Sequence, residues 1–289
     1  MFKNKLKTIT EHGFHMKQTM NTKWLSYPYM IWMIGFIIIP LILIFFYGFT
    51  AQEGGFTLKN ITLISDPINR KALYLSLVLS LISTLICLIL AYPLALILRN
   101  AKMNSNSFIV LIIILPMWMN FLLRTIAWQN ILERNGVLNS LLKLFHLPTI
   151  NLINTPEAII LGMVYNFLPF MVLPIYNVLI KIDQDVINAA RDLGANGSQT
   201  FRKIIFPLTL PGVFSGITMV FVPSLTTFAI STILGGSKIV LIGNVIEQQF
   251  RYENWHTGSG LSLVLMIFIL LSMSIMTKYD KGNEGGNLW

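Results

Sequence analysis

The sequence predicts an all-α polytopic membrane protein with about six transmembrane helices. Of its 289 residues, 54% are hydrophobic and only 11% are charged, whereas about a quarter of the residues in a typical soluble domain are charged. The apolar residues also form long runs, separated by polar segments that carry most of the Lys and Arg. Together these observations predict a chain that crosses a bilayer several times.

Composition also argues against several classes of function. The net charge is +9, but the basic residues are scattered between apolar blocks, which favours a role in membrane orientation over nucleic-acid binding. The single cysteine, Cys87, lies in an apolar run and excludes an intramolecular disulfide or a CxxC site. The four histidines lack HExxH-like spacing. We therefore expect no metal site and no catalytic residues.

Each predicted span is an apolar run long enough, or nearly so, to cross the hydrocarbon core, for which about 20 residues suffice. The spans are residues 29–49, 72–98, 108–123, 156–180, 213–234 and 257–276. The fourth contains Pro169 and Pro174 and the fifth contains Pro223, so both are expected to bend. Membrane helices tolerate such prolines where neighbouring helices or a wet cavity satisfy the freed carbonyls.

The charges outside the spans predict the orientation. Residues 1–28 form a lysine-bearing tail, which the positive-inside rule places in the cytoplasm. An even number of spans returns the tail of residues 277–289 to the same side. We expect a single transmembrane domain, residues 29–276, in a bacterial cytoplasmic (inner) membrane.

Three further segments are assigned to the outer side. Residues 52–71 contain glycines, a proline and charges typical of a loop. Residues 124–154 alternate apolar and charged side chains, which predicts an amphipathic helix lying near the interface. Residues 235–256 form a second loop, whose apolar piece, 239–246, is too short to span the bilayer.

The longest polar interruption in the second half of the chain is the segment of residues 183–212. Asp183 or Asp185 is expected to cap a short helix, and Gly194 is expected to end it in a left-handed conformation. Most of the apolar residues of this helix fall on one side: Val186, Ile187, Ala189, Ala190 and Leu193.

A second short helix is predicted directly after the first. Asn196 or Ser198 is expected to cap a run over residues 199–206, and Pro207 is expected to end it. The segment therefore reads as two short helices joined at a turn, on the cytoplasmic side between the fourth and fifth spans.

This segment resembles the EAA loop of bacterial ABC importer permeases, E-A-A-x3-G-x9-I-x-L-P. The chain has Asn188-Ala189-Ala190, Gly194, Ile204 and Pro207 at that spacing, with Asn188 in place of the glutamate and Phe206 in place of the leucine. In that family the loop docks on a cytoplasmic ATPase subunit. The resemblance implies an ABC type I importer permease fold. It also implies these ATPase-coupling residues: Asn188, Ala189, Ala190, Arg191, Asp192, Leu193, Gly194, Ile204 and Pro207.

The resemblance to permeases of the spermidine/putrescine type extends over residues 56–276. It is carried by NAARDLGA, IIFPLTLPG, VYNFLPFMVLPIY and GGSKIVLIGNVIEQQF. It implies a second permease subunit in a heterodimer, two cytoplasmic ATPase subunits that use ATP and Mg²⁺, and an external polyamine-binding protein. The sequence has no GxxxxGK[ST] pattern. We therefore expect a transport subunit that binds no cofactor itself and is not an enzyme.

A polyamine is a flexible polycation, so its path should offer aromatic faces, amide or hydroxyl oxygens and a few carboxylates. The candidate substrate-path residues are Trp118, Asn120, Trp128, Glu157, Tyr165, Asn166, Tyr176, Thr226 and Thr227. The same residue types also have structural roles in membrane proteins, because Trp and Tyr lie at the membrane interfaces and Asn and Thr form hydrogen bonds between helices. Arg124 would repel a cation unless Glu157 or another acid pairs with it, so it is expected to anchor its helix end.

Two alternatives stay open. The same class of permease could carry another small solute, such as an anion, a metal or an amino acid, because Arg124 and the lack of mid-span acids permit it. A stand-alone secondary transporter or channel would need no ATPase. Uptake competition separates the cargoes, and transport by the chain alone would favour the second alternative.

Overall fold

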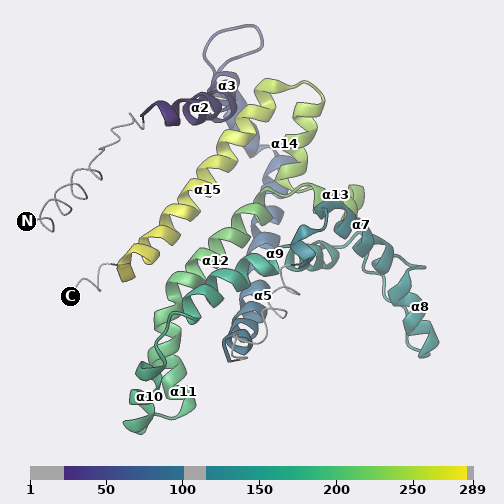
Figure 1. Cartoon of the computed structure of the whole chain (residues 1–289). Coiled ribbons are helices and arrows are strands. Elements are labelled where there is room, and N and C mark those ends of the chain that lie inside the picture. The colour runs from purple at the N-terminus through teal and green to yellow at the C-terminus, as the bar shows by residue number, and fades with distance from the viewer. Residues whose placement is uncertain (1–22, 101–114, 285–289) are drawn as a thin grey trace, which may run out of the picture. The chain divides into compact units, whose positions relative to one another are not determined.

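The computed structural model describes residues 23–100 and 115–284, and all regular elements there are helices (Figure 1). The helices long and apolar enough to cross a membrane are Tyr27–Phe49, Pro67–Arg99, Pro156–Leu179, Gly197–Thr226 and Trp255–Met276. They confirm five of the six predicted spans. Of the third, residues 108–114 lie outside the described residues. The chain divides into two compact units, residues 1–46 and 47–289.

The first unit contains the first span. It comprises α2 (Lys23–Met33), the π-helix η1 (Ile34–Ile38) and most of α3 (Ile39–Phe49), whose last turn belongs to the second unit. The π turn immediately precedes Pro40. A proline lacks the amide proton and its ring clashes with the carbonyl of the preceding turn, so the wider π turn lets the helix continue.

The second unit is built on three mutually packed helices: α5 (Pro67–Asn100), α9 (Pro156–Leu179) and α12 (Phe206–Thr226). Small residues on α5, among them Ala91 and Ala95, are fully buried. A buried hydrogen bond of 2.6 Å joins Tyr92 Oη of α5 to Thr209 Oγ1 of α12. In addition, α15 (Trp255–Glu284) packs against α12 and α14 (Ile242–Arg251).

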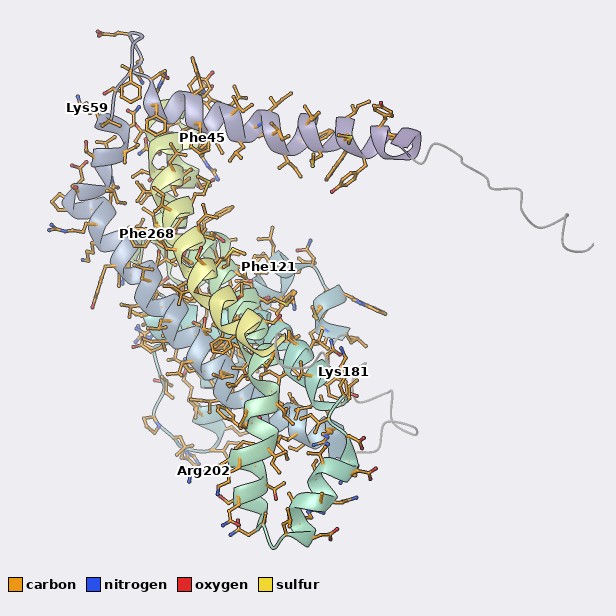
Figure 2. The ribbon with its side chains drawn as sticks, turned by 90° about the vertical axis from the view of Figure 1, so that its left-hand side faces the viewer. Phe45, Lys59, Phe121, Lys181, Arg202 and Phe268 are labelled. Atoms are coloured by element: carbon orange, nitrogen blue, oxygen red, sulfur yellow. The ribbon has the colours of Figure 1, made fainter. Side chains whose placement is uncertain are left out.

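The short helices α10 (Gln184–Asp192) and α11 (Gly197–Thr200) connect α9 to α12 at one end of the second unit (Figure 1). Figure 2 shows Lys181 and Arg202 near this end and Lys59 near the opposite end. The segment 183–212 and the loop that follows the first span therefore lie at opposite ends of the same unit.

The prediction that Pro207 ends the second short helix is wrong. Helix α11 passes through the π-helix η3 (Phe201–Ile205) into α12, as a single helical stretch from Gly197 to Thr226. The amide of Phe206 donates to the carbonyl of Phe201, and Pro207 follows in the first turn of α12. As at Pro40, a π turn accommodates the proline.

Two predicted spans are interrupted. Residues 115–118 are helical, Met119 and Asn120 are not, and α7 (Phe121–Leu132) follows. Likewise α12 ends at Thr226, Thr227 is extended, and α13 (Ala229–Leu234) follows. The prediction of continuous helices over 108–123 and 213–234 is therefore wrong at these breaks. Beyond them, α7 packs against α13.

The outer segments are more helical than predicted. Residues 124–154 form no single helix, because Gly136 starts a new one, α8 (Val137–Leu144), after α7. The first loop contains α4 (Lys59–Thr62) and the 3₁₀ turn η2 (Leu63–Ser65), and the second contains the 3₁₀ turn η4 (Gly236–Lys238) and α14. Its apolar piece, residues 239–246, was read as loop, but from Ile242 onward it forms the start of α14, where Ile242, Gly243 and Val245 are buried.

Candidate functional site

Helix α10 is fixed to the unit by its inner face and by its cap. The Asp183 side chain accepts a hydrogen bond of 3.0 Å from the amide of Asp185, so Asp183 is the N-cap of the predicted pair. Ile187 and Ala190 are buried, at 3% and 8% exposure. The start and the inward face of the helix are thereby defined, and its remaining residues face outward.

The turn after α10 is closed by its own hydrogen bonds. Gly194 has φ of +84°, and its amide donates to the carbonyl of Arg191 while Ala195 donates to that of Ala190. This is the Schellman pattern, which favours glycine at the left-handed position. Asn196 and Gln199 then form a reciprocal capping box, with both bonds at 2.9 Å. The two short helices therefore meet in a fixed geometry.

The outward face of α10 carries an apolar strip with polar edges. Leu193 is 89% exposed and Val186 is 46% exposed, with Ala189 between them. The polar coupling residues Asn188, Arg191 and Asp192 are exposed beside the strip. Nothing in the described part of the chain covers this face, which has the shape and chemistry of a docking surface.

The predicted coupling residues thus fall into two sets. Residues 188–194 lie together on α10 and its terminal turn, although Ala190 points inward. Ile204 is half-buried on η3 and Pro207 is exposed on α12. The second set belongs to the start of the long helix, so the motif spans both the outward-facing helix and the span that follows it.

The sequence analysis did not single out Arg99, at the inner end of α5. Its Nη2 donates a hydrogen bond of 3.2 Å to the carbonyl of Ile182, in the turn before α10. A cavity of about 550 Å³ at this junction is lined by Arg99, Tyr176, Lys181 and Asp183, among others. The position of Arg99 in the short basic turn after the second span was the available signal. This bond ties α5 to the entry of the 183–212 segment.

Four of the candidate substrate-path residues lie at the two helix breaks. Trp118 and Asn120 flank the first break, and Trp118 is 76% exposed. Asn120 is also the N-cap of α7. Thr227 lies in the second break and Thr226 directly precedes it, and the Thr226 hydroxyl donates to the carbonyl of Val222 in its own helix.

The other candidates do not gather at one point. The rings of Trp128 and Tyr165 pack edge to face with centroids 5.3 Å apart. Glu157 is exposed in the first turn of α9. Asn166 is buried within α9, and its Oδ1 has no hydrogen-bond partner. Tyr176 is buried near the other end of α9, so the predicted set extends along the bundle.

The second break borders a cavity of about 610 Å³ between α14, α15 and the end of α12. Its lining includes Thr226, Phe228, Glu247, Phe250 and Ser262. Apart from Thr226, the sequence analysis missed these residues; Glu247 and Phe250 were missed because α14 was read as loop. The period of the apolar residues in α14 was the signal that could have found them.

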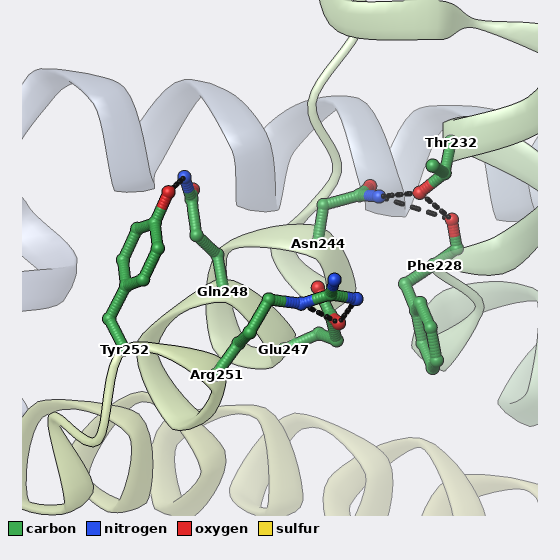
Figure 3. Close-up of polar contacts among 7 residues, drawn as sticks. All are labelled: Phe228, Thr232, Asn244, Glu247, Gln248, Arg251 and Tyr252. Atoms are coloured by element: carbon green, nitrogen blue, oxygen red, sulfur yellow. Dashed lines mark hydrogen bonds and ion pairs between the residues drawn. The ribbon is translucent and has the colours of Figure 1, made fainter.

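A polar network holds the helices around this break (Figure 3). The Asn244 amide accepts from Ser231 Oγ at 2.6 Å and donates to Thr232 Oγ1 at 2.8 Å and the Phe228 carbonyl at 3.1 Å. One turn further on, Glu247 accepts hydrogen bonds from Arg251. These bonds and the ion pair raise the pKa of the Arg251 guanidinium. The network fixes α13 against α14.

Arg124, in the first turn of α7, is buried at 7% exposure. Among the described residues the ion pair between Arg251 and Glu247 is the one salt bridge. A pairing of Arg124 with Glu157 or another acid, the condition under which Arg124 would not repel a cation, is therefore not found within the described part of the chain.

Comparison with known proteins places the chain in a family. Residues 13–282 match the family model described as a binding-protein-dependent transport system inner membrane component. The spermidine/putrescine transport system permease protein PotB of Haemophilus influenzae is 35% identical over 260 residues, which cover 86% of this chain and 91% of that protein. PotB of Escherichia coli K12 is 38% identical over 253 residues, covering 84% and 92%.

Solved structures support the same fold. A bacterial ABC transporter involved in the import of the acidic polysaccharide alginate matches with a TM-score of 0.73 at 19% identity, covering 89% of this chain and 97% of that chain. The MetNI methionine ABC transporter in an inward-facing conformation matches with a TM-score of 0.54 at 18% identity, covering 75% and 98%. The chain belongs to the binding-protein-dependent inner-membrane components, the permease subunits of ABC importers.

Proposed function

We propose that this chain forms part of the translocation path of an ATP-driven importer and is coupled to a separate ATPase through residues 183–212. The observation that carries the coupling role is the outward face of α10. An exposed apolar strip at Val186, Ala189 and Leu193 is presented on a helix whose cap and terminal turn are hydrogen-bonded. A rigid helix of this kind transmits movement to the two spans that flank it.

The cargo we propose is a polyamine, spermidine or putrescine. Support comes from the PotB relatives, which are named for this transport and align over most of their length. The helix breaks at 119–120 and 227–228 support a path there, because irregular backbone at membrane depth is tolerated where it lines a cavity or is buried in protein. Unwound segments also expose carbonyl oxygens, which attract cations.

The assembly we propose contains a second permease subunit in a heterodimer, two cytoplasmic ATPase subunits and an external polyamine-binding protein. ATP and Mg²⁺ would be used by the ATPase subunits, and this chain would bind neither. The 183–212 end would face the cytoplasm together with both termini. Support for the external binding protein comes from the solved bacterial alginate ABC transporter in complex with an alginate pentasaccharide-bound periplasmic protein.

Replacing Gly194 with valine tests the coupling role. Valine at φ of +84° is strained, so the turn after α10 should reorient and uptake into reconstituted vesicles should fall by about ten-fold or more, a cost of about 1.4 kcal/mol. Gly197→Val is the matched control, because Gly197 has ordinary φ and open space around its Cβ position. Normal uptake by Gly194→Val with the ATPase bound would contradict the proposal.

Uptake competition between labelled and unlabelled solutes identifies the transported substrate. Uptake of labelled putrescine should be inhibited by unlabelled spermidine and putrescine, and not by anions, divalent metals or amino acids. Inhibition by one of those solutes instead would retain the permease class and replace the cargo. Transport by the purified chain without any ATPase would point to a secondary transporter.

A further inference from the structure

Arg124 is a buried cation with no ion-pair partner among the described residues. Its side chain lies on the face of α7 that also buries Thr125 and Leu132, and α7 packs against α13. Its Nε and Nη1 atoms are enclosed and have no hydrogen-bond partner. Leaving a buried charge uncompensated costs several kcal/mol, so a neutralising group is expected in the working protein.

The chain itself offers no suitable acid. The described carboxylates form no ion pair with Arg124. The segment of residues 101–114, which precedes α7 in sequence and is not described, contains no Asp or Glu. Residues 1–22 contain one acid, Glu11, in the predicted cytoplasmic tail. The counter-charge is therefore expected from another molecule.

Neither lipid nor substrate fits this position. Arg124 lies in the first turn after the irregular backbone at residues 119–120, and irregular backbone at membrane depth is not left exposed to lipid, so protein is favoured over lipid phosphate beside this turn. A polyamine carries positive charge and would be repelled. This second exclusion rests on the proposed function.

A second protein chain does fit. The break beside Arg124 is open in this chain, since Trp118 is 76% exposed and Met119 is 52% exposed. Irregular backbone at membrane depth is covered by protein or lines a water-filled cavity. A subunit that covers the break passes directly beside the first turn of α7. A carboxylate on it needs to reach Nη2, the guanidinium nitrogen that is not enclosed by this chain, to form a charge-assisted pair.

We propose that Arg124 binds a side-chain carboxylate of the second permease subunit, across the break at residues 119–120. Arg124 is then a contact that holds the two permeases together next to the path. This inference rests on the proposed function, in which a second permease exists.

Replacing Arg124 with methionine tests the pairing, because the effect should have opposite signs in the chain alone and in the complex. In the full chain alone in detergent, Arg124→Met removes an uncompensated charge, so the Tm should rise. In the complex it leaves the partner's carboxylate unpaired, so the affinity for the co-expressed second permease should fall by about 30-fold or more. Arg124→Lys, which keeps the charge, should retain more of that affinity than Arg124→Met.

Arg134→Met is the matched control, because Arg134 is an exposed arginine in the turn between α7 and α8, and it should change neither quantity. An affinity of Arg124→Met within about two-fold of the native value overturns the inference. A lowered Tm of the chain alone also overturns it, because Arg124 would then have a partner within the chain. If the native chain binds no second permease, the proposed heterodimer fails, and the inference fails with it.

Discussion

Gly212 determines how closely α12 approaches α9. A Cβ atom at this position would lie 2.8 Å from the carbonyl oxygen of Pro174 and 3.1 Å from the Cα of Ile175. Both are backbone atoms, so neither can turn away as a side chain does. The contact involves the last residue of the segment 183–212, where motion of α10 would reach the packed spans.

We predict that Gly212→Ala destabilises the chain by about 1–3 kcal/mol, the usual cost of overpacking a well-packed core. Thermal unfolding in detergent measures the effect as a lowered Tm. Gly197→Ala is the control, because its Cβ would meet nothing within 4 Å, and alanine should favour the helix. Equal Tm values for the two variants would show that α9 and α12 separate without cost.

Asn166 was predicted to lie in the substrate path, but its burial favours a structural role. The sequence placed it in the substrate path because it is an amide in a membrane span. The structure buries it, with Nδ2 donating to the carbonyl of Gly162 at 2.9 Å and Oδ1 unpartnered. An amide in this state holds a helix interior, and contact with a solute would require the packing around α9 to open.

At the scale of elements, the two interrupted spans are the main departure from a simple bundle. Each outer piece, α7 and α13, begins immediately after a break and packs against the other. Asn120 caps the first by accepting from the amides of Leu122 and Leu123. Asn244 holds the second through bonds to Phe228 and Thr232. The breaks are therefore stabilised by specific side chains.

Asn244→Leu should loosen α13 from α14. The substitution removes the amide's bonds to Ser231, Thr232 and the Phe228 carbonyl, and each lost hydrogen bond costs about 0.5–1.5 kcal/mol. Hydrogen exchange should accelerate in residues 228–251 and stay unchanged in residues 206–220.

Gln248→Leu serves as the control for this prediction. Gln248 is exposed on the same helix, and its amide reaches Tyr252 Oη at the long distance of 3.5 Å (Figure 3). If the two leucine variants exchange alike, Asn244 does not hold these helices together.

The sequence was sufficient for elements whose signal is length and polarity. The five confirmed spans follow from runs of apolar residues, and turn chemistry narrowed the cap of α10 to Asp183 or Asp185. The helix breaks could not be predicted from the sequence, because Met119, Thr227 and Phe228 are apolar or small residues that continue the apolar runs around them. At Pro207 the sequence predicted a helix end where the helix continues. The π turn that allows this depends on tertiary packing, and local sequence rules do not predict it.

At the scale of the whole molecule, the distribution of Lys and Arg predicts which end of the protein faces the cytoplasm. Lys181 and Arg202 lie toward the end that carries α10 and α11, and Lys59 lies toward the opposite end (Figure 2). The positive-inside rule, together with the proposed ATPase contact, assigns the former end to the cytoplasm.

Single-cysteine labelling tests this orientation in intact cells. A membrane-impermeant maleimide should label Glu53→Cys from outside and should label Ser198→Cys only after the cells are opened, since both positions are exposed in the structure. The native Cys87 is the chain's single cysteine and is buried, so the unsubstituted chain is the background control. Labelling of Ser198→Cys in intact cells would show that the orientation is the opposite of the one predicted.

The uninterrupted helix from Gly197 to Thr226 has a mechanical consequence. Its 30 residues extend over about 45 Å at about 1.5 Å per residue, from the capping box at Asn196 to the extended Thr227. No non-helical residue lies between these points, so a displacement at the end that carries α10 and α11 travels along one continuous helix, which includes Pro211 and Pro223. The helix ends at the break at Thr227, beside the 610 Å³ cavity. Movement of the segment with the predicted coupling residues is thereby directed to the cavity at the opposite end of α12.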